Sequence, residues 1–287
     1  VVAVVTVADK PAGRGQRLQE SSVKKYALSQ QIPVLQPISL RDEGFLAQLK
    51  AFQADVQVVV AFRMLPKVVW QMPRKGTFNL HASLLPDYRG AAPINWAIIG
   101  GEATTGVTTF LIDEQIDTGA ILLRKEVAIA PRETAGTLHD KLMTVGADLV
   151  VETLALIASD KAVPQSQPKQ VVEKSAPKIH KETSHIPWEQ SLAQIDRFVR
   201  GMSPYPTAWA QLHHEGEAYA VKIYEATPQE ATHNLPIGRV LLEDKQIKVA
   251  VQGGFLKIES LQFPSKKRMS AREFLNCFHF AEGDFFA

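Results

Sequence analysis

Short apolar runs alternate with stretches of helical spacing through the first half of the chain. The runs that predict strands are VVAVVTV (1–7), PVLQP (33–37), VQVVVAF (56–62), TFNLH (77–81), GVTTFLI (106–112) and AILLRKEVAI (120–129). Between them lie SSVKKYALSQQ, RDEGFLAQLKAFQ and PINWAIIGG, and a longer helix is predicted at about residues 133–159. Apolar strands separated by helices predict an α/β fold with a mostly parallel sheet covered on both faces.

The pattern changes after the long helix. The stretch VPQSQPKQVVEKSAPK (163–178) is rich in Pro, Gln and Lys and has no sustained period, which is typical of a linker. A short amphipathic helix and several short alternating strands follow, as in a small barrel or sandwich. We therefore predict a first domain over 1–162, a linker over 163–182 and a second domain over 183–287.

Composition excludes several classes of protein. The 287 residues are 45% hydrophobic and 22% charged, which is ordinary for a globular protein, and the net charge of +2 gives no argument for nucleic acid by itself. Since Cys277 is the only cysteine, the chain can form no internal disulfide, which favours a cytoplasmic setting. The apolar run 1–7 is too short to span a bilayer, so we expect no membrane partner.

Polar side chains end one of the apolar strands. Asn79 and His81 are two residues apart in TFNLH, so strand alternation places them on the same side. A second cluster, LIDEQIDTGAIL (111–122), joins the next two strands and carries Asp117. Neighbouring strands would bring Asp117 to the sheet edge where His81 lies, and ligands of such sheets bind at that edge. The alternative is a set of satisfied polar residues and a structural turn at Asp117.

An Asn, a His and an Asp at one edge fit direct acyl transfer. Asn and a protonated His can donate hydrogen bonds to a developing oxyanion, and Asp can hold the His oriented and charged. The chain has no G-x-S-x-G motif around a nucleophilic serine and no H-E-x-x-H motif. We therefore expect neither a covalent enzyme intermediate nor a metal.

The motifs together resemble the folate-dependent formyltransferases, most closely those that formylate methionyl initiator tRNA. The resemblance rests on FNLHASLLPDYRGAAPINWAI and IDTG, and extends from DKPAGRG to SKKRMSAREFLN. It implies a Rossmann-like domain followed by an OB-like β-barrel, with 10-formyltetrahydrofolate as the formyl donor. It also implies that Asn79, His81 and Asp117 are catalytic and that the folate site is lined by Ser83, Leu84, Leu85 and Pro86.

The resemblance also assigns an RNA-binding role to the basic loop near the start of the chain. Cationic side chains beside glycines suit contact with phosphates. The residues expected to contact tRNA are Lys10, Arg14, Arg17, Lys266, Lys267 and Arg268. We expect a monomer. Two other functions stay open, namely formylation of a small amine, such as an amino sugar or a purine precursor, and folate or RNA binding without catalysis.

The chain departs from the family pattern in three places. The family's first strand and helix do not precede Val1, so we expect upstream residues in the working protein. The sequence SSVK (21–24) stands where the family has SPVK, and AFRML (61–65) stands where many members have a Tyr-Gly pair. These departures concern the shape of the basic loop and the detail of the folate pocket.

Overall fold

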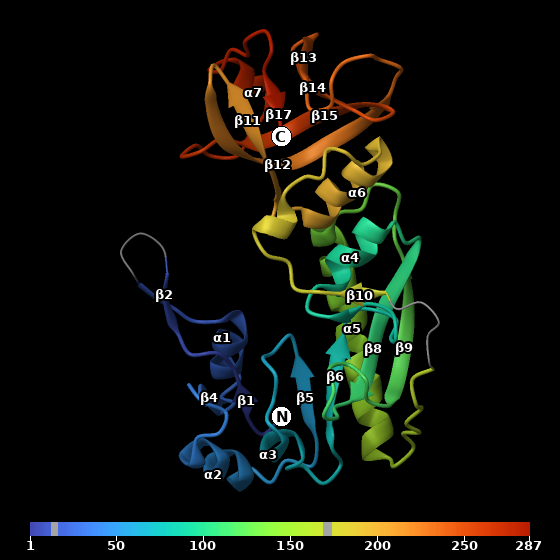
Figure 1. The fold of residues 1–287 in the computed structure, drawn as a ribbon. Coiled ribbons are helices and arrows are strands. Elements are labelled where there is room, and N and C mark those ends of the chain that lie inside the picture. The colour runs from blue at the N-terminus through green and yellow to red at the C-terminus, as the bar shows by residue number, and fades with distance from the viewer. Residues whose placement is uncertain (13–16, 169–173) are drawn as a thin grey trace. The chain divides into compact units, whose positions relative to one another are not determined.

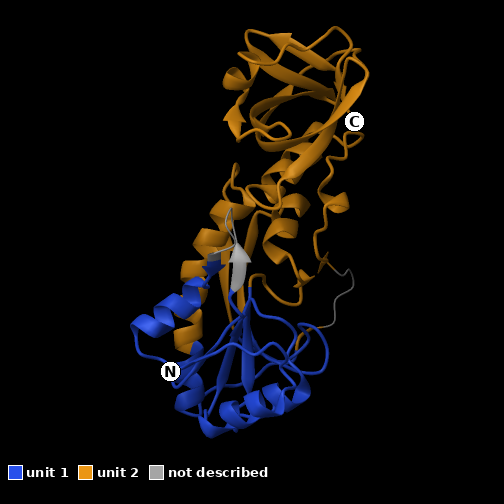
Figure 2. Cartoon of the chain, turned by 90° about the vertical axis from the view of Figure 1, so that its left-hand side faces the viewer, with its two compact units in different colours: residues 1–81, 109–122, 153–166 blue, residues 82–108, 123–152, 167–287 orange. Residues whose placement is uncertain are grey.

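The computed structural model describes residues 1–12, 17–168 and 174–287, and for 10–12 and 17 the backbone alone. The chain forms two compact units (Figure 2). Unit 1 comprises residues 1–81, 109–122 and 153–166, and unit 2 comprises 82–108, 123–152 and 167–287. Three elements contribute residues to both units: β8 (Thr104–Leu111), β9 (Ile121–Ala128) and α5 (Ala135–Ala158).

Unit 1 begins with short strands and capped helices. Its elements are β1 (Val4–Val5), β2 (Lys10–Ala12), β3 (Arg17–Gln19), α1 (Ser22–Ser29), β4 (Val34–Leu35), α2 (Glu43–Ala51), β5 (Gln57–Val60), α3 (Lys67–Trp70) and β6 (Thr77–His81). The α2 helix begins where Asp42 accepts a hydrogen bond of 2.8 Å from the backbone N–H of Phe45, which satisfies an N–H group left free at the helix start. Leu40, Phe45 and Leu49 are buried together against Val69 and form a small core.

A four-stranded sheet in the order β5-β6-β8-β9 positions the polar strand (Figure 1). β5 and β6 are parallel, with Val59 opposite Asn79. β8 and β9 run antiparallel, because Leu111 bonds to Ala120 at one end of the pair and Ile129 to Ala103 at the other. The predicted alternation of strands and helices is thus confirmed, with β1 and β4 forming a separate parallel pair rather than joining this sheet.

Unit 2 contains two helices that pack on each other. They are α4 (Pro93–Gly100) and α6 (Leu192–Met202). The side-chain amide of Asn95 donates a 2.7 Å hydrogen bond to the carbonyl of Gly201, and Gly201 has no side chain to separate the helices. On the other side of α6, Asp196 is buried between Arg132 and Arg200 at 2.6 and 2.9 Å. These contacts fix α6 against the segments that precede it in unit 2.

The C-terminal part is a curled antiparallel sheet. Its strands are β11 (Ala208–His214), β12 (Glu217–Glu230), β13 (Val240–Glu243), β14 (Gln246–Val251), β15 (Gly254–Gln262), β16 (Met269–Ser270) and β17 (Phe285–Phe286), with the helix α7 (Ala271–Leu275). The strand order is β13-β14-β15-β12-β11-β17. Backbone bonds from Val240 to Asp284 and from Phe286 to Gly238 link the two ends of that order, which curls the sheet into the predicted barrel-like form.

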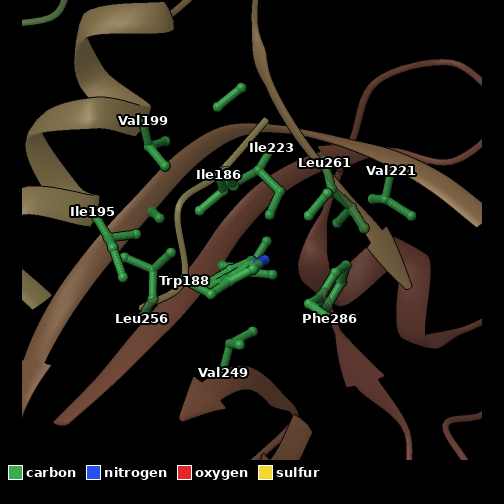
Figure 3. Close-up of a cluster of buried hydrophobic side chains, with 14 of the residues drawn as sticks. Ile186, Trp188, Ile195, Val199, Val221, Ile223, Val249, Leu256, Leu261 and Phe286 are labelled. Atoms are coloured by element: carbon green, nitrogen blue, oxygen red, sulfur yellow. The ribbon is translucent and has the colours of Figure 1, made fainter. Parts of the chain in front are cut away.

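Alternate side chains of these strands point into one apolar core (Figure 3). Trp188 lies within it, with its ring centre 5.9 Å from that of Phe286. Ile195 and Val199 on α6 contribute to the same core, so the helix is packed on the curled sheet. The apolar residues of the period-2 pattern that predicted the second domain are therefore the ones on the inward face of this sheet.

The described ends of the predicted linker are bonded to other segments. Gln165 pairs with Ile121 through two backbone hydrogen bonds in unit 1. In unit 2, β10 (Ser175–Ala176) pairs in parallel with β7 (Arg89–Gly90). A short 3-10 helix, Glu182–Ser184, follows. The predicted domain boundaries themselves stay predictions.

Candidate functional site

The strand β6 delivers two polar side chains at its carboxyl end. Phe78 is fully buried, and alternation places Asn79 and His81 on the opposite side of the strand. His81 is 6% exposed, and its ring meets the ring of Phe110 edge-on at 6.4 Å. Burial limits the rotamers that the imidazole can adopt, so its ring nitrogens have a defined direction.

A short polar loop carries the third residue. Asp117 has a left-handed backbone with φ of 55°, a conformation that Asp tolerates better than most residues. One carboxylate oxygen of Asp113 accepts hydrogen bonds from the backbone N–H of Gln115 at 3.0 Å and from the hydroxyl of Thr118 at 2.8 Å. Asp113 therefore closes the loop around Asp117.

Gly119 ends this loop under a tight steric limit. A Cβ at Gly119 would overlap the carbonyl oxygen of Leu111, because Leu111 bonds to Ala120 across the base of the loop. The Thr-Gly that follows Asp117 is therefore more than common turn chemistry. Because Gly119 has no side chain, β8 and the residues that begin β9 can pair immediately after Asp117.

The structure brings Asp117 and His81 together. The Oδ2 atom of Asp117 lies 3.8 Å from Nδ1 of His81, and the two side chains are 13% and 7% exposed. A carboxylate at that distance restricts the orientation of the imidazole.

Asn79 carries a buried amide oxygen with no hydrogen-bond partner among the described residues. Leaving such a group unsatisfied costs about 1–3 kcal/mol, and orphaned groups of this kind occur at functional sites. Amide oxygen and nitrogen are assigned from their contacts, so the observation concerns the whole amide. In the unit that also holds His81 and Asp117, the amide nitrogen of Asn79 can donate to a formyl oxygen, and its amide oxygen can accept from an N–H donor such as an attacking amine.

The segment predicted to line a folate site lies in unit 2. Ser83 and Leu85 are fully buried and Pro86 is buried, whereas Leu84 is half-buried. The hydroxyl of Ser83 donates a 2.6 Å bond to the carbonyl of Asp87 within the segment. A ligand would therefore meet Leu84 and the backbone rather than the serine hydroxyl.

The residues predicted to contact tRNA divide into four groups. Arg14 lies outside the described residues, and Lys10 and Arg17 are described by backbone alone, in the paired strands β2 and β3. Lys266 and Lys267 are exposed. Arg268 is engaged within the protein: its guanidinium bonds to Ser260 at 2.8 Å and Glu225 at 2.7 Å and lies 4.6 Å from the ring centre of Tyr224.

The sequence analysis missed a row of polar and aromatic side chains across the outside of the curled sheet. Trp209 on β11 lies opposite Lys222 on β12, which lies opposite Gln262 on β15. Their sequence neighbours Ala208, Ala210, Val221, Ile223 and Leu261 are core residues, so these three point outward. The ammonium of Lys181 lies 5.5 Å from the ring centre of Trp209.

Two further residues extend this row. The hydroxyl of Tyr224 donates a 2.9 Å bond to the side chain of Gln262, and the amide of Gln262 bonds to the carbonyl of Lys266 at 2.9 Å. Arg268 stacks over Tyr224, as described above. We call Lys181, Trp209, Lys222, Gln262, Tyr224 and Arg268 the outer row. Cations interleaved with aromatic rings suit nucleic acid, since the cations meet phosphates and the rings stack on bases.

Neither a metal cluster nor a membrane span is present in the part of the chain that the structure describes. No group of three or more His, Cys, Asp or Glu side chains among those residues could hold a metal ion. None of the described helices has the length and apolar character needed to cross a bilayer.

Comparison with known proteins agrees with this arrangement. The family model described as Formyl transferase matches residues 1–154, and the one described as Formyl transferase, C-terminal domain, matches residues 178–279. A methionyl-tRNA formyltransferase of Flavobacterium johnsoniae is 53% identical over 98% of this chain and 90% of its own length. Its counterpart in Parabacteroides distasonis is 54% identical over 97% of this chain and 88% of its own length.

Two solved structures share the fold at lower identity. HypX from Aquifex aeolicus, in complex with tetrahydrofolic acid, is 20% identical with a TM-score of 0.66, over 95% of this chain and 46% of that one. An N-formyltransferase from Helicobacter canadensis, with folinic acid and dTDP-3-aminofucose, is 18% identical with a TM-score of 0.59 and covers 91% of this chain and 86% of that one. At these identities the likeness concerns the fold.

Proposed function

This chain belongs to the formyl transferase family, and we propose that it transfers the formyl group of 10-formyltetrahydrofolate to the α-amino group of methionyl initiator tRNA. The product is N-formylmethionyl-tRNA for translation initiation. The observation that carries the proposal is identity above 50% to methionyl-tRNA formyltransferases over nearly the whole of both chains. The convergence of His81 and Asp117 beside the orphaned amide of Asn79 supports it independently.

Each of the three residues has a role in this transfer. 10-Formyltetrahydrofolate supplies the one-carbon unit, bound to a nitrogen that must become the leaving group. Asn79 and His81 donate hydrogen bonds to the formyl oxygen as negative charge develops on it. Asp117 orients the imidazole of His81 and assists the movement of a proton from the methionyl amine to the leaving nitrogen. The transfer is direct and forms no covalent bond to the protein.

The outer row is the proposed contact surface for tRNA in the C-terminal part. Lys181 and Lys222 form no ion pair with any described residue, so their charges remain available to phosphates. Arg268 is held by Glu225 and Ser260 and so contributes mainly a stacked guanidinium over Tyr224. Lys266 and Lys267 lie next to this surface, and Lys10, Arg14 and Arg17 are the proposed contacts near the start of the chain.

The second candidate function is formylation of a small amine such as an amino sugar. Its support is the fold shared with an N-formyltransferase solved with dTDP-3-aminofucose. A small acceptor has no need of the outer row, whose lysines and rings extend across three strands of the curled sheet. A folate- or RNA-binding protein without catalysis has no need of the buried His81–Asp117 pair. We further propose that the protein acts as a monomer in the cytoplasm.

An acceptor assay tests the proposal. The protein, extended by any upstream residues its gene encodes, is incubated with 10-formyltetrahydrofolate and with either charged initiator tRNA or a panel of amino sugars. Formylation of methionyl-tRNA alone is expected. Formylation of the sugars in preference to the tRNA would support the second candidate, and no formylation with intact RNA binding would support the binding protein.

A further inference from the structure

A short strap from the predicted linker is bonded along the loop that follows the predicted folate segment. The strap comprises residues 174–177, and the loop continues into α4. The backbone N–H of Tyr88 donates to the carbonyl of Lys174 at 2.6 Å, and that of Ala92 donates to the carbonyl of Ala176 at 3.2 Å. Gly90 makes this approach possible, since a Cβ there would overlap the carbonyl oxygen of Ala176.

Three polar side chains join where the strap begins. The hydroxyl of Tyr88 donates a 2.6 Å hydrogen bond to Oε1 of Glu102, and the ammonium of Lys174 donates to the same oxygen at 2.8 Å. Lys174 also lies 3.8 Å from a carboxylate oxygen of Asp87 and 5.9 Å from the ring centre of Tyr88. Tyr88 is 8% exposed, so its hydroxyl is removed from water and its geometry is fixed by Glu102.

The same cluster reaches the predicted folate segment through the backbone. Ser83 donates from its hydroxyl to the carbonyl of Asp87, the residue between Pro86 and Tyr88. The other end of the segment is held separately, because Thr108 bonds to both the carbonyl of Ser83 and the N–H of Leu85. With Tyr88 fixed, the four residues 83–86 are held at both ends.

We propose that Lys174, Glu102 and Tyr88 form a positioning triad, by which the strap fixes the backbone of residues 83–86 for the folate donor. The inference rests on the proposed function and adds three positioning residues to it. None of the three touches the reacting atoms. Their effect is on the affinity for the folate, since a loosened segment must be ordered again each time a donor binds.

Substitutions in the triad distinguish an effect on folate affinity from an effect on the stability of the whole protein. Lys174→Met and Tyr88→Phe are each expected to raise KM for 10-formyltetrahydrofolate by about tenfold, with kcat within about twofold, as for the loss of uniform binding. The Kd for tetrahydrofolate, titrated directly, should rise by the same factor, whereas KM for charged tRNA should not change. Lys174→Arg, which keeps the cation, should restore most of the affinity.

Lys75→Met is the matched control. Lys75 is likewise a lysine paired with a carboxylate, Asp160 at 2.7 Å, and it belongs to unit 1, whereas the triad belongs to unit 2. Its loss should lower the melting temperature without moving either folate constant. The inference is overturned if Lys174→Met and Tyr88→Phe also lower only the melting temperature, or if wild-type protein binds no tetrahydrofolate. Wild-type protein that binds tetrahydrofolate but formylates no tRNA would refute the proposed function instead, and the titration would still decide the role of the triad.

Discussion

Asp113 is the residue on which the placement of Asp117 most directly depends. Its Oδ1 atom accepts the bonds from Gln115 and Thr118 that close the loop, and its Oδ2 atom accepts a second bond of 3.0 Å from the Thr118 hydroxyl. Asp113→Ala should lower kcat by about tenfold or more, since small displacements of a catalytic group are costly. Asp113→Asn keeps an acceptor oxygen and should stay within about twofold of wild type. Steady-state kinetics decide this, and equal loss in both variants would mean that charge rather than loop closure matters.

Glu102 should make stability depend on pH. Burial alone would raise the pKa of Glu102, but hydrogen bonds from Lys174 and Tyr88 and the charge of Lys174 hold it below its usual value. A depressed folded-state pKa stabilises the protein above the unfolded value of about 4.3 and ceases to do so as the pH falls through the folded value. The difference in melting temperature between wild type and Glu102→Gln should therefore be full near pH 6 and shrink below about pH 4.3. A difference that is constant or grows in acid would contradict this.

At the residue scale, strand alternation and motif spacing predict which side chains lie at the same edge of the sheet. Asn79 and His81 share a strand, and Asp117 follows the next one, so their common edge was predictable; their catalytic roles stay predictions. Glu102 and Lys174 are 72 residues apart in the chain, and their contact depends on how the strap folds back. No local pattern reports such a pair.

The packing of α4 on α6 depends on a single small residue. A Cβ on Gly201 would lie 2.5 Å from Cγ1 of Ile99 and 3.0 Å from the carbonyl oxygen of Asn95. Gly201→Ala should therefore destabilise the protein by about 1–3 kcal/mol, because overpacking outweighs the better helix propensity of Ala. Ala193→Leu, on an exposed position of the same helix, is the control and should have little effect. A stabilised Gly201→Ala protein in denaturant unfolding would mean that the helices separate easily.

At the element scale, long periodic segments were predicted well. The helix expected at about 133–159 is α5, Ala135–Ala158, and all six predicted strands of the first half exist. The pairing of β7 with β10 was missed, since two residues in each strand carry no period. The separate β1–β4 pair was missed for another reason: strand patterns report faces, not partners.

At the scale of the whole molecule, the outer row should set the salt dependence of RNA binding. Lys222→Ala should weaken the binding of initiator tRNA and reduce the slope of log K against log salt by about one, as for the loss of one phosphate contact. Lys141→Ala, which removes a lysine paired with Glu133, should leave the slope unchanged. A wild-type slope in Lys222→Ala would exclude the residue from the interface.

The hydrophobic pattern changes near residue 163, from helical segments and apolar strands to short alternating strands, and this change predicted the β-rich part that the structure contains as the curled sheet. The outer row could not be predicted from the sequence. Its members come from β11, β12, β15 and the segments beside these strands, and they lie side by side only once the strands have paired. A count of charges gives +2 for the whole chain and conceals such a local surface.

The central claim is that the amide of Asn79 acts with His81 and Asp117 in formyl transfer itself. The most direct test is the single-turnover rate of Asn79→Ala, measured with saturating 10-formyltetrahydrofolate and charged initiator tRNA, beside its affinities for tetrahydrofolate and tRNA. We predict a rate about 100-fold or more below wild type, the usual loss for one oxyanion donor, with both affinities retained. A wild-type rate would contradict the claim.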